Sequence, residues 1–332
     1  MRVALIGTGR IGAAHAEVVR DHPEVERLVV ADADATRASV LAEKLGVEHA
    51  PVEEAMTAVD AVVIAAATTA HPELIVEAAR RGLPVFCEKP LAADVGTSVR
   101  VVDEVRAAGV PTQIGFQRRF DAGYGAAREA LRSGALGELR RVHALTGDRE
   151  PPPAEYIQTS GGIFRDCHVH DFDILRWVTG REVTEVYAVG ANRGAAFFAE
   201  GGDVDESAAL LTLDDGTLVT LQGSRYNGGG HDVRMELAGT AATWVVGLDA
   251  RAALVSAEAG VDFPDGTPWQ SFWGRWTPAY VAEMNAFVDL ALGRRDSACT
   301  VEEALEAFYV AEAATLSRLQ HRPVTLDEVR AT

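Results

Sequence analysis

Asp166 and His170 have the residue types and the spacing that proton transfer requires. They lie four residues apart, where a helix is expected to begin near Asp166. At this spacing both side chains share a helix face, together with Asp173. A carboxylate beside a histidine fixes the orientation and tautomer of the ring and stabilises the imidazolium. The pattern predicts an acid–base pair for a hydroxyl proton. Taken alone, His170 would more often be a hydrogen-bonded histidine in a packed helix.

Metal-binding atoms also occur in this segment, on Cys167, His168 and His170. Side chains at i and i+2 of a helix point apart, and no further cysteine–histidine cluster completes a tetrahedral set. We therefore expect no metal here. We also expect Cys167 and His168 to project away from the acid–base face.

Lys89 is a second candidate for chemistry, within Glu88-Lys89-Pro90. It follows the apolar run Pro84–Cys87 at the end of an expected strand. A lysine there can bind a substrate hydroxyl or stabilise a developing alkoxide, and Pro90 restricts Lys89 to extended backbone. The alternative, a solvated ion pair between Glu88 and Lys89, is equally compatible with the spacing.

A glycine-rich segment follows the apolar run Val3–Ile6 directly and opens an expected helix. Gly7 permits a tight turn, Gly9 lets a pyrophosphate approach bare backbone, and Gly12 lets the helix pack closely on the strand. The helix N-terminus, which includes Arg10 and Ile11, presents free N–H groups to the phosphates. This context predicts a dinucleotide site.

Asp32 refines that prediction, because it ends a second apolar run, Leu28–Ala31, twenty positions after Gly12. A carboxylate there binds the ribose 2′-hydroxyl and repels a 2′-phosphate, which favours NAD over NADP. Arg37 would soften the preference if it folded back toward the ribose. The alternative for Asp32 is an ordinary turn residue.

Weaker candidates lie in expected loops and strand ends. Thr68 and His71 follow the strand Ala61–Ala67 and are predicted to line the cofactor cleft; Thr69 is a possible helix N-cap instead. The later candidates are polar or aromatic and could contact a polyol or serve ordinary surface roles: Arg149, Tyr156, Arg225, Tyr226, Asn227 and His231.

The elements that must position these residues form two patterns. Up to about Gly115, strand and helix signals alternate, which predicts an α/β domain with a doubly wound parallel sheet. After Asp121, strand-like runs and a hairpin turn at Asp214-Asp215-Gly216 predict an α+β domain with a largely antiparallel open sheet. We expect domains at 1–120 and 121–332.

Composition narrows the class of partner. The 332-residue chain carries a net charge of −18, which argues against nucleic acid or an anionic membrane. No apolar stretch approaches the roughly 20 residues of a membrane span, and the first strand begins at Arg2, so no cleaved signal is expected. Three cysteines without CxxC spacing predict free thiols and a cytoplasmic location.

Taken together, these motifs resemble the Gfo/Idh/MocA family of oxidoreductases over residues 1–330. The resemblance rests on the glycine segment with His15, on Glu88-Lys89-Pro90, and on Asp166 with His170. It implies a Rossmann domain and a C-terminal open sheet used for homodimer or homotetramer contacts. It also implies cofactor contacts at Glu88 and Lys89.

The chain is most similar to the inositol 2-dehydrogenase branch of the family. This similarity implies that His170 is the acid/base, Asp166 its partner and Lys89 the group that orients the hydroxyl. The expected reaction is oxidation of a secondary hydroxyl of a cyclitol or sugar with NAD. The chain departs from the branch at Gly228–His231, where a tyrosine is usual before the aspartate, so His231 stands at an expected substrate contact.

Two other functions occur in the same family. One is a glycosidase that uses NAD for transient oxidation with no net redox change. The other is a non-catalytic NAD(H) sensor, which would have no need of Lys89, Asp166 and His170 together.

Overall fold

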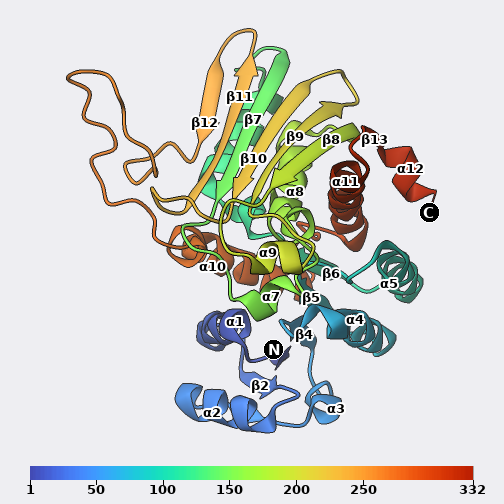
Figure 1. The fold of residues 1–332 in the computed structure, drawn as a ribbon. Coiled ribbons are helices and arrows are strands. Elements are labelled where there is room, and N and C mark those ends of the chain that lie inside the picture. Colours follow the sequence, from blue (N-terminus) through green and yellow to red (C-terminus); the bar gives the residue numbers. More distant parts are fainter. Residues whose placement is uncertain (332) are drawn as a thin grey trace. The chain divides into compact units, whose positions relative to one another are not determined.

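The computed structural model describes residues 1–331, which divide by their contacts into two units (Figure 1). The first unit comprises Met1–Gln117 and Pro278–Glu306. The second comprises Arg118–Thr277 and the residues from Ala307 on. The expected boundary at 120/121 lies close to the first crossing between the units, but the segment from Pro278 to Glu306 groups with the N-terminal residues.

The first unit contains a six-stranded sheet in which every adjacent pair is parallel. Across the sheet the strands are β3 (Glu48–His49), β2 (Arg27–Ala31), β1 (Arg2–Ile6), β4 (Ala61–Ile64), β5 (Val85–Glu88) and β6 (Thr112–Gly115). The chain leaves β1 in one direction for β2 and β3 and in the other for β4 to β6. This topology confirms the predicted doubly wound sheet.

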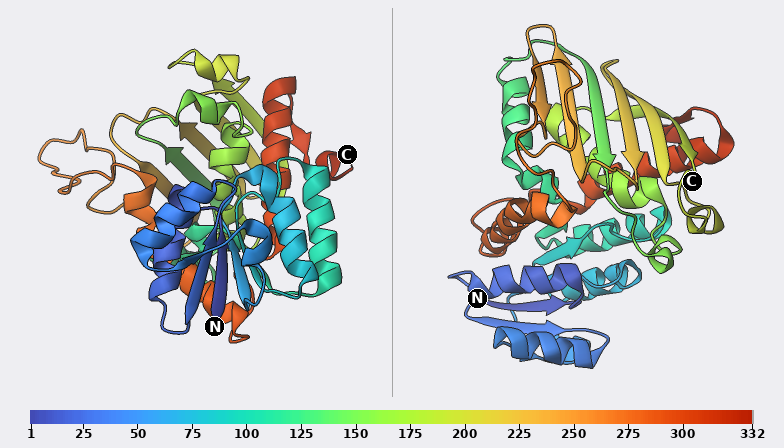
Figure 2. Two further views of the ribbon diagram at one scale, coloured as in Figure 1. Left: turned by 90° about the horizontal axis from the view of Figure 1, so that it is seen from below. Right: turned by 60° about the vertical axis from the view of Figure 1, so that its left-hand side comes forward.

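Helices cover both faces of this sheet (Figure 2). In chain order they are α1 (Arg10–Asp21), α2 (Ala35–Leu45), α3 (Val52–Ala55), α4 (His71–Arg80), α5 (Val95–Ala108) and α10 (Phe272–Ala291), of which α10 begins in the second unit. Val3, Leu5 and Val30 point to one face, where they pack with apolar residues of α1 and α2. Alternate residues point to the opposite face, as strand geometry requires.

Residues of α10 complete the core on the face covered by α1 and α2. Met284, Phe287 and Leu290 are buried in the same apolar cluster as β1, α1 and α2. The sequence pattern predicts this helix but not the sheet on which it packs, because the apolar face of a helix has the same pattern whichever sheet it covers. The first unit is therefore built from two segments that are distant in the chain.

The second unit contains a seven-stranded sheet. Its strands, in order across the sheet, are β12 (Thr243–Val246), β11 (Asp232–Gly239), β7 (Leu139–Gly147), β10 (Leu218–Ser224), β9 (Glu206–Leu213), β8 (Val183–Ala191) and β13 (Val324–Thr325). The β7–β10 pair is parallel and the other adjacent pairs are antiparallel. The predicted hairpin at Asp214-Asp215-Gly216 joins β9 to β10, and the expected α+β class is confirmed.

Helices cover one side of this second sheet (Figure 2). They are α6 (Ala122–Arg132), α8 (Val169–Thr179), α11 (Val301–Gln320, which starts in the first unit) and α12 (Leu326–Arg330). Two one-turn helices, α7 (Ala154–Ile157) and α9 (Phe197–Glu200), lie together at one end of the strands (Figure 1). Exposed apolar side chains occur along its strands: Tyr187, Val189, Leu210, Leu218, Trp244 and Val245. Among residues 1–331, no helix combines the length and apolar character needed to cross a membrane.

Candidate active site

The glycine loop between β1 and α1 has the shape that a dinucleotide pyrophosphate requires. A Cβ on Gly7, whose φ is +99°, would lie 2.3 Å from the Ala66 nitrogen, and one on Gly12 would lie 1.8 Å from the Gly7 carbonyl oxygen. A Cβ on Gly9 would meet no atom within 4 Å, so the backbone there is open to a ligand. Gly9 is also the N-cap of α1 and provides no side-chain cap, while Arg10 and Ile11 begin the helix.

Asp32 follows β2 at the same edge of the sheet and is held firmly. Its Oδ2 accepts hydrogen bonds from the Thr8 N–H (2.7 Å) and hydroxyl (2.9 Å), and its Oδ1 accepts one from the Asp34 N–H (2.9 Å). Burial alone would raise the pKa of Asp32, but these hydrogen bonds outweigh it and hold the pKa below its usual range. Arg37 approaches Asp32 to 4.0 Å and is largely exposed. Asp32 therefore stabilises a turn and presents an ionised carboxylate.

Thr68 lies in a single 3-10 turn, η1 (Thr68–Ala70), directly before α4. The N-cap of α4 is Ala70, without a side-chain hydrogen bond, so the alternative in which Thr69 caps this helix is wrong. Thr68 follows β4 at the carboxyl end of the sheet, the edge at which doubly wound folds bind their ligands.

His71 is buried and ties two loops together within the first unit. Its Nδ1 lies 2.7 Å from the Pro90 carbonyl oxygen and its Nε2 lies 3.1 Å from the Ala66 carbonyl oxygen. Burial lowers the pKa of His71 and so favours the neutral ring, which has one N–H and can donate to one of these two carbonyl oxygens. His71 thus braces the loop that carries Lys89 and Pro90. A direct contact with the cofactor stays a prediction.

Glu88 ends β5 and is bound to His15 of α1. The Nε2 of His15 lies 2.7 Å from Glu88 Oε1, and the two side chains are only 1% and 15% exposed. Phe86 and Tyr280 pack edge-on against the His15 ring, at centroid distances of 5.3 and 5.8 Å. The alternative of a solvated Glu88–Lys89 pair is wrong for Glu88, because its carboxylate is turned inward. Lys89 follows, with a cis peptide bond to Pro90.

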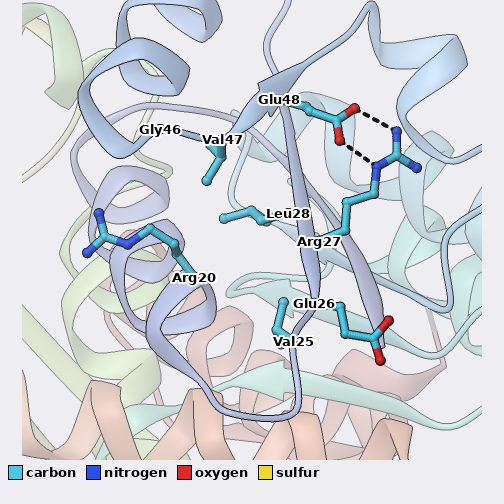
Figure 3. A pocket seen from close by; sticks show the side chains of 8 residues that line it. All are labelled: Arg20, Val25, Glu26, Arg27, Leu28, Gly46, Val47 and Glu48. Atoms are coloured by element: carbon cyan, nitrogen blue, oxygen red, sulfur yellow. Dashed lines mark hydrogen bonds and ion pairs between the residues drawn. The ribbon is translucent and has the colours of Figure 1, made fainter.

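A surface pocket of the first unit lies away from these residues (Figure 3). It is lined by Arg20, Val25 to Leu28 and Gly46 to Glu48, at the amino ends of β2 and β3. Arg27 and Glu48 form a two-point ion pair at its edge, with both contacts at 2.7 Å (Figure 3). Ligands of doubly wound sheets bind at the opposite, carboxyl edge, so this pocket is not the candidate site.

In the second unit, the segment before α8 differs from the predicted regular helix. Residues Phe164–His168 form η3, a π-helical turn, and the α-helix begins only at Val169. Two glycines with positive φ precede the turn, and the Ile163 N–H donates to Asp203 Oδ1 at 2.9 Å. Such π-turns are rare and occur often at functional sites. The turn changes which side chains share a face.

Asp166 lies in this turn with both carboxylate oxygens engaged. The Tyr156 hydroxyl donates to Oδ1 at 2.7 Å and Arg225 Nη2 donates to Oδ2 at 2.8 Å. Cys167, expected to point away, instead contacts the same guanidinium, with Sγ 2.9 Å from Arg225 Nη1. That expectation is wrong because a π-turn holds more residues than an α-turn and rotates successive side chains by smaller angles.

Asp148, which no sequence motif marked, completes this cluster. Its Oδ2 lies 3.2 Å from Arg225 Nη1, and its Oδ1 lies 3.3 Å from Nδ1 of His231, a side chain only 4% exposed. Arg149, the next residue, is hydrogen-bonded to Gln270. A buried arginine requires acidic partners. This rule predicts that a buried Arg225 would have a carboxylate partner, but it does not identify Asp148 as that partner.

His170 is the second residue of α8, whose N-terminal half is fixed by two arginines of η2 (Gln117–Phe120). Arg118 pairs with Asp171, and Arg119 binds Asp173 at 2.6 and 2.9 Å, with all four side chains buried. Asp173 therefore faces Arg119, which corrects the expectation that it shares a face with Asp166. No motif in the sequence marked Arg118 or Arg119 as partners of these carboxylates.

His168, the other histidine of this segment, is also buried. Its ring nitrogens lie 2.8 Å from Asp171 and 2.8 Å from Ser207. As predicted, His168 projects away from the Asp166 cluster.

Known proteins match both units of this chain. Residues 1–116 match the oxidoreductase family with an NAD-binding Rossmann fold, and residues 124–245 match the GFO/IDH/MocA C-terminal domain. A myo-inositol dehydrogenase from Streptomyces leeuwenhoekii is 36% identical over 300 residues, which cover 88% of this chain and 89% of the relative. An NAD(+)-dependent scyllo-inositol 2-dehydrogenase from Bacillus subtilis is 34% identical over 337 residues, which cover 100% of this chain and 98% of that relative.

A solved structure agrees with these relatives. The scyllo-inositol dehydrogenase from Lactobacillus casei, with bound NAD(H) and scyllo-inositol, has a TM-score of 0.87 and 25% identity, covering 98% of this chain and 99% of that one. The predicted Rossmann domain, its NAD cofactor and the family resemblance are thereby confirmed. The chain belongs to the GFO/IDH/MocA family of NAD-binding oxidoreductases.

Proposed function

We propose that this enzyme oxidises a secondary hydroxyl of an inositol-like cyclitol or sugar to a ketone. The observation that carries the proposal is the Asp166 carboxylate, engaged at both oxygens in a π-turn four residues before His170. The myo- and scyllo-inositol dehydrogenases among the relatives support the substrate class.

In this proposal each residue has a defined task. His170 takes the hydroxyl proton, Asp166 stabilises the imidazolium that forms, and Lys89 orients the hydroxyl and stabilises developing negative charge on its oxygen. NAD, when bound, supplies the acceptor for the hydride. The side chains of the protein lower the activation barrier of hydride transfer by orienting the substrate and by stabilising charge.

Cofactor contacts are proposed at two levels. Direct contacts are assigned to the glycine loop with Arg10 and Ile11, to Asp32 on the ribose, and to Thr68 and Lys89. His71 and Glu88 act on the same edge of the sheet, His71 through the Pro90 carbonyl and Glu88 through His15. Substrate contacts are proposed for Arg149 and Tyr156. His231 is buried against Asp148, so its proposed role is to hold that carboxylate instead of touching the substrate directly.

A substrate panel tests the proposed function. Purified protein with NAD should produce NADH, measured as absorbance at 340 nm, with at least one of myo-, scyllo- or D-chiro-inositol. Glucose and xylose extend the panel to aldoses. Silence across the panel with NAD binding intact would contradict the proposal and would favour the glycosidase or the sensor.

Asp32 provides a test of cofactor preference. Asp32→Ser should raise the ratio of kcat/KM for NADP to that for NAD by about 10- to 100-fold. The variant removes a charge-assisted hydrogen bond to the ribose and the repulsion of a 2′-phosphate while Arg37 remains. The matched control is Asp34→Ser, which removes a neighbouring exposed carboxylate but keeps a residue able to cap α2. An unchanged ratio in Asp32→Ser would exclude the ribose role.

We further propose that a second copy of the chain covers the apolar side chains on the second sheet. Leu210, Leu218 and Val245 are 58%, 62% and 37% exposed, and the strand register places all three on the same face of the sheet. Exposed apolar patches of this kind mark interaction surfaces.

A further inference from the structure

Arg225 lies at the centre of the Asp166 cluster and has no part in the roles assigned above. Its side chain is 3% exposed, and its guanidinium contacts Asp166 Oδ2 at 2.8 Å, Asp148 Oδ2 at 3.2 Å and Cys167 Sγ at 2.9 Å. These partners come from η3 and from the residue after β7, while Arg225 itself follows β10. One side chain therefore joins three parts of the second unit.

Groups of opposite charge meet in this cluster. One guanidinium faces two carboxylates, Asp148 and Asp166, which repel one another. Burial alone would lower the pKa of Arg225, but the anionic groups around it raise the pKa overall, so it stays charged. Burial alone would raise the pKa of Asp148, but His231 and Arg225 lower it. Asp148 and Asp166 thus share the charge of Arg225, and His231 lies beside Asp148 as a second group that can carry positive charge.

We propose that Arg225 is the positioning residue that aims the Asp166 carboxylate and keeps it ionised, and that Asp148 sets how strongly Arg225 acts. The inference rests on the proposed function, because Asp166 matters only if His170 exchanges a proton there. The Tyr156 hydroxyl and Arg225 hold the two oxygens of Asp166, so the carboxylate has one orientation. In the proposed function Asp166 stabilises the imidazolium that forms when His170 takes a proton, so the orientation and charge of Asp166 act on that step.

This arrangement predicts opposite effects from two neighbouring substitutions. Arg225→Gln removes a cation, which raises the pKa of the coupled Asp166–His170 pair, whichever member titrates. Asp148→Asn removes an anion and lowers that pKa. The other titratable groups facing the cluster are Tyr156, Cys167 and His231, and all remain in both variants.

The test measures kcat and KM against pH for the wild type and both variants. Arg225→Gln should lower kcat about 10- to 100-fold with little change in KM, and should move the acidic limb of the kcat profile up by about one pH unit or more. Asp148→Asn should move the limb down. Arg225→Lys should recover part of kcat, because the charge returns without the two-point geometry.

The matched control is Arg176→Gln. Arg176 is a buried arginine of α8, the helix that carries His170, and it binds Glu182 at 2.6 and 2.8 Å. This variant should cost a similar loss of stability without moving the pH limb. If Arg225→Gln does not fold, Asp148→Asn tests the proposal by itself: a downward shift of its acidic limb supports the role of Arg225, and an unmoved limb overturns it.

Failure of this inference differs from failure of the proposed function. A wild type active on a cyclitol and inactivated by Asp166→Asn, with Arg225→Gln unchanged or shifted no more than Arg176→Gln, overturns the role of Arg225 alone. A wild type inactive on every substrate overturns the proposed function, and this role with it.

Discussion

Replacing His170 by alanine should lower kcat by about 10²- to 10⁴-fold and leave the Kd for NAD nearly unchanged. In the proposed function His170 is the group that accepts the hydroxyl proton, and alanine cannot. The glycine loop and Asp32 belong to the other unit of the chain, so the dinucleotide contacts assigned to them persist. Turnover is followed at 340 nm, and NAD binding by titration of intrinsic tryptophan fluorescence.

A histidine of the same unit serves as the control for that experiment. His143 lies on β7, is exposed, and contacts Thr220 at 2.8 Å. His143→Ala should retain turnover. Turnover in His170→Ala equal to that of His143→Ala would remove His170 from the mechanism, and a loss of NAD binding in His170→Ala would indicate a structural role instead.

Arg118→Met should lower the free energy of unfolding by about 3–5 kcal/mol. Arg118 is buried against Asp171, donates to Thr146 at 3.2 Å, and lies 5.5 Å from the ring centre of Trp276. Methionine preserves much of the apolar contact but leaves the Asp171 carboxylate buried without its cation. Urea unfolding at pH 7, followed by circular dichroism, measures the loss.

The same pair has a pH dependence with a defined sign. Burial alone would raise the pKa of Asp171, but Arg118, His168 and Thr146 hold it far below its usual range. A depressed folded-state pKa contributes stability that is complete above the unfolded value, about 3.9, and is lost as pH falls toward the folded value. The difference between wild type and Arg118→Met should therefore be largest near neutral pH and shrink below about pH 4.

A double variant separates the missing cation from any other effect of the substitution. Arg118→Met combined with Asp171→Asn should be less destabilised than Arg118→Met alone, because no unpaired charge remains buried. Strict additivity of the two substitutions would contradict the importance of this ion pair.

The sequence predicts much of this fold because the signals are local. The apolar run Val3–Ile6, the glycines after it and Asp32 lie within one βαβ unit, so their spacing alone specifies strand, turn and helix. The hairpin at Asp214-Asp215-Gly216 was predictable for the same reason. Such patterns determine an element without knowledge of the rest of the chain.

What the sequence could not predict depends on contacts between distant residues. Arg225 is 59 positions from Asp166 and 77 from Asp148, and no periodicity links them. The π-turn was equally hidden, because its residues fit an α-helical pattern and the wider turn is stabilised by outside partners. One such partner is Glu312, which binds Arg165 at 2.5 and 2.6 Å.

The return of α10 to the first unit affects the order in which the protein can mature on the ribosome. Met284, Phe287 and Leu290 close the apolar face covered by α1 and α2, yet they emerge long after the six parallel strands. Domains generally fold as units during synthesis, N-terminal first. Here the nascent dinucleotide-binding half exposes unpaired apolar surface until nearly the whole chain has been made, which makes it a natural client for chaperones that bind such surface.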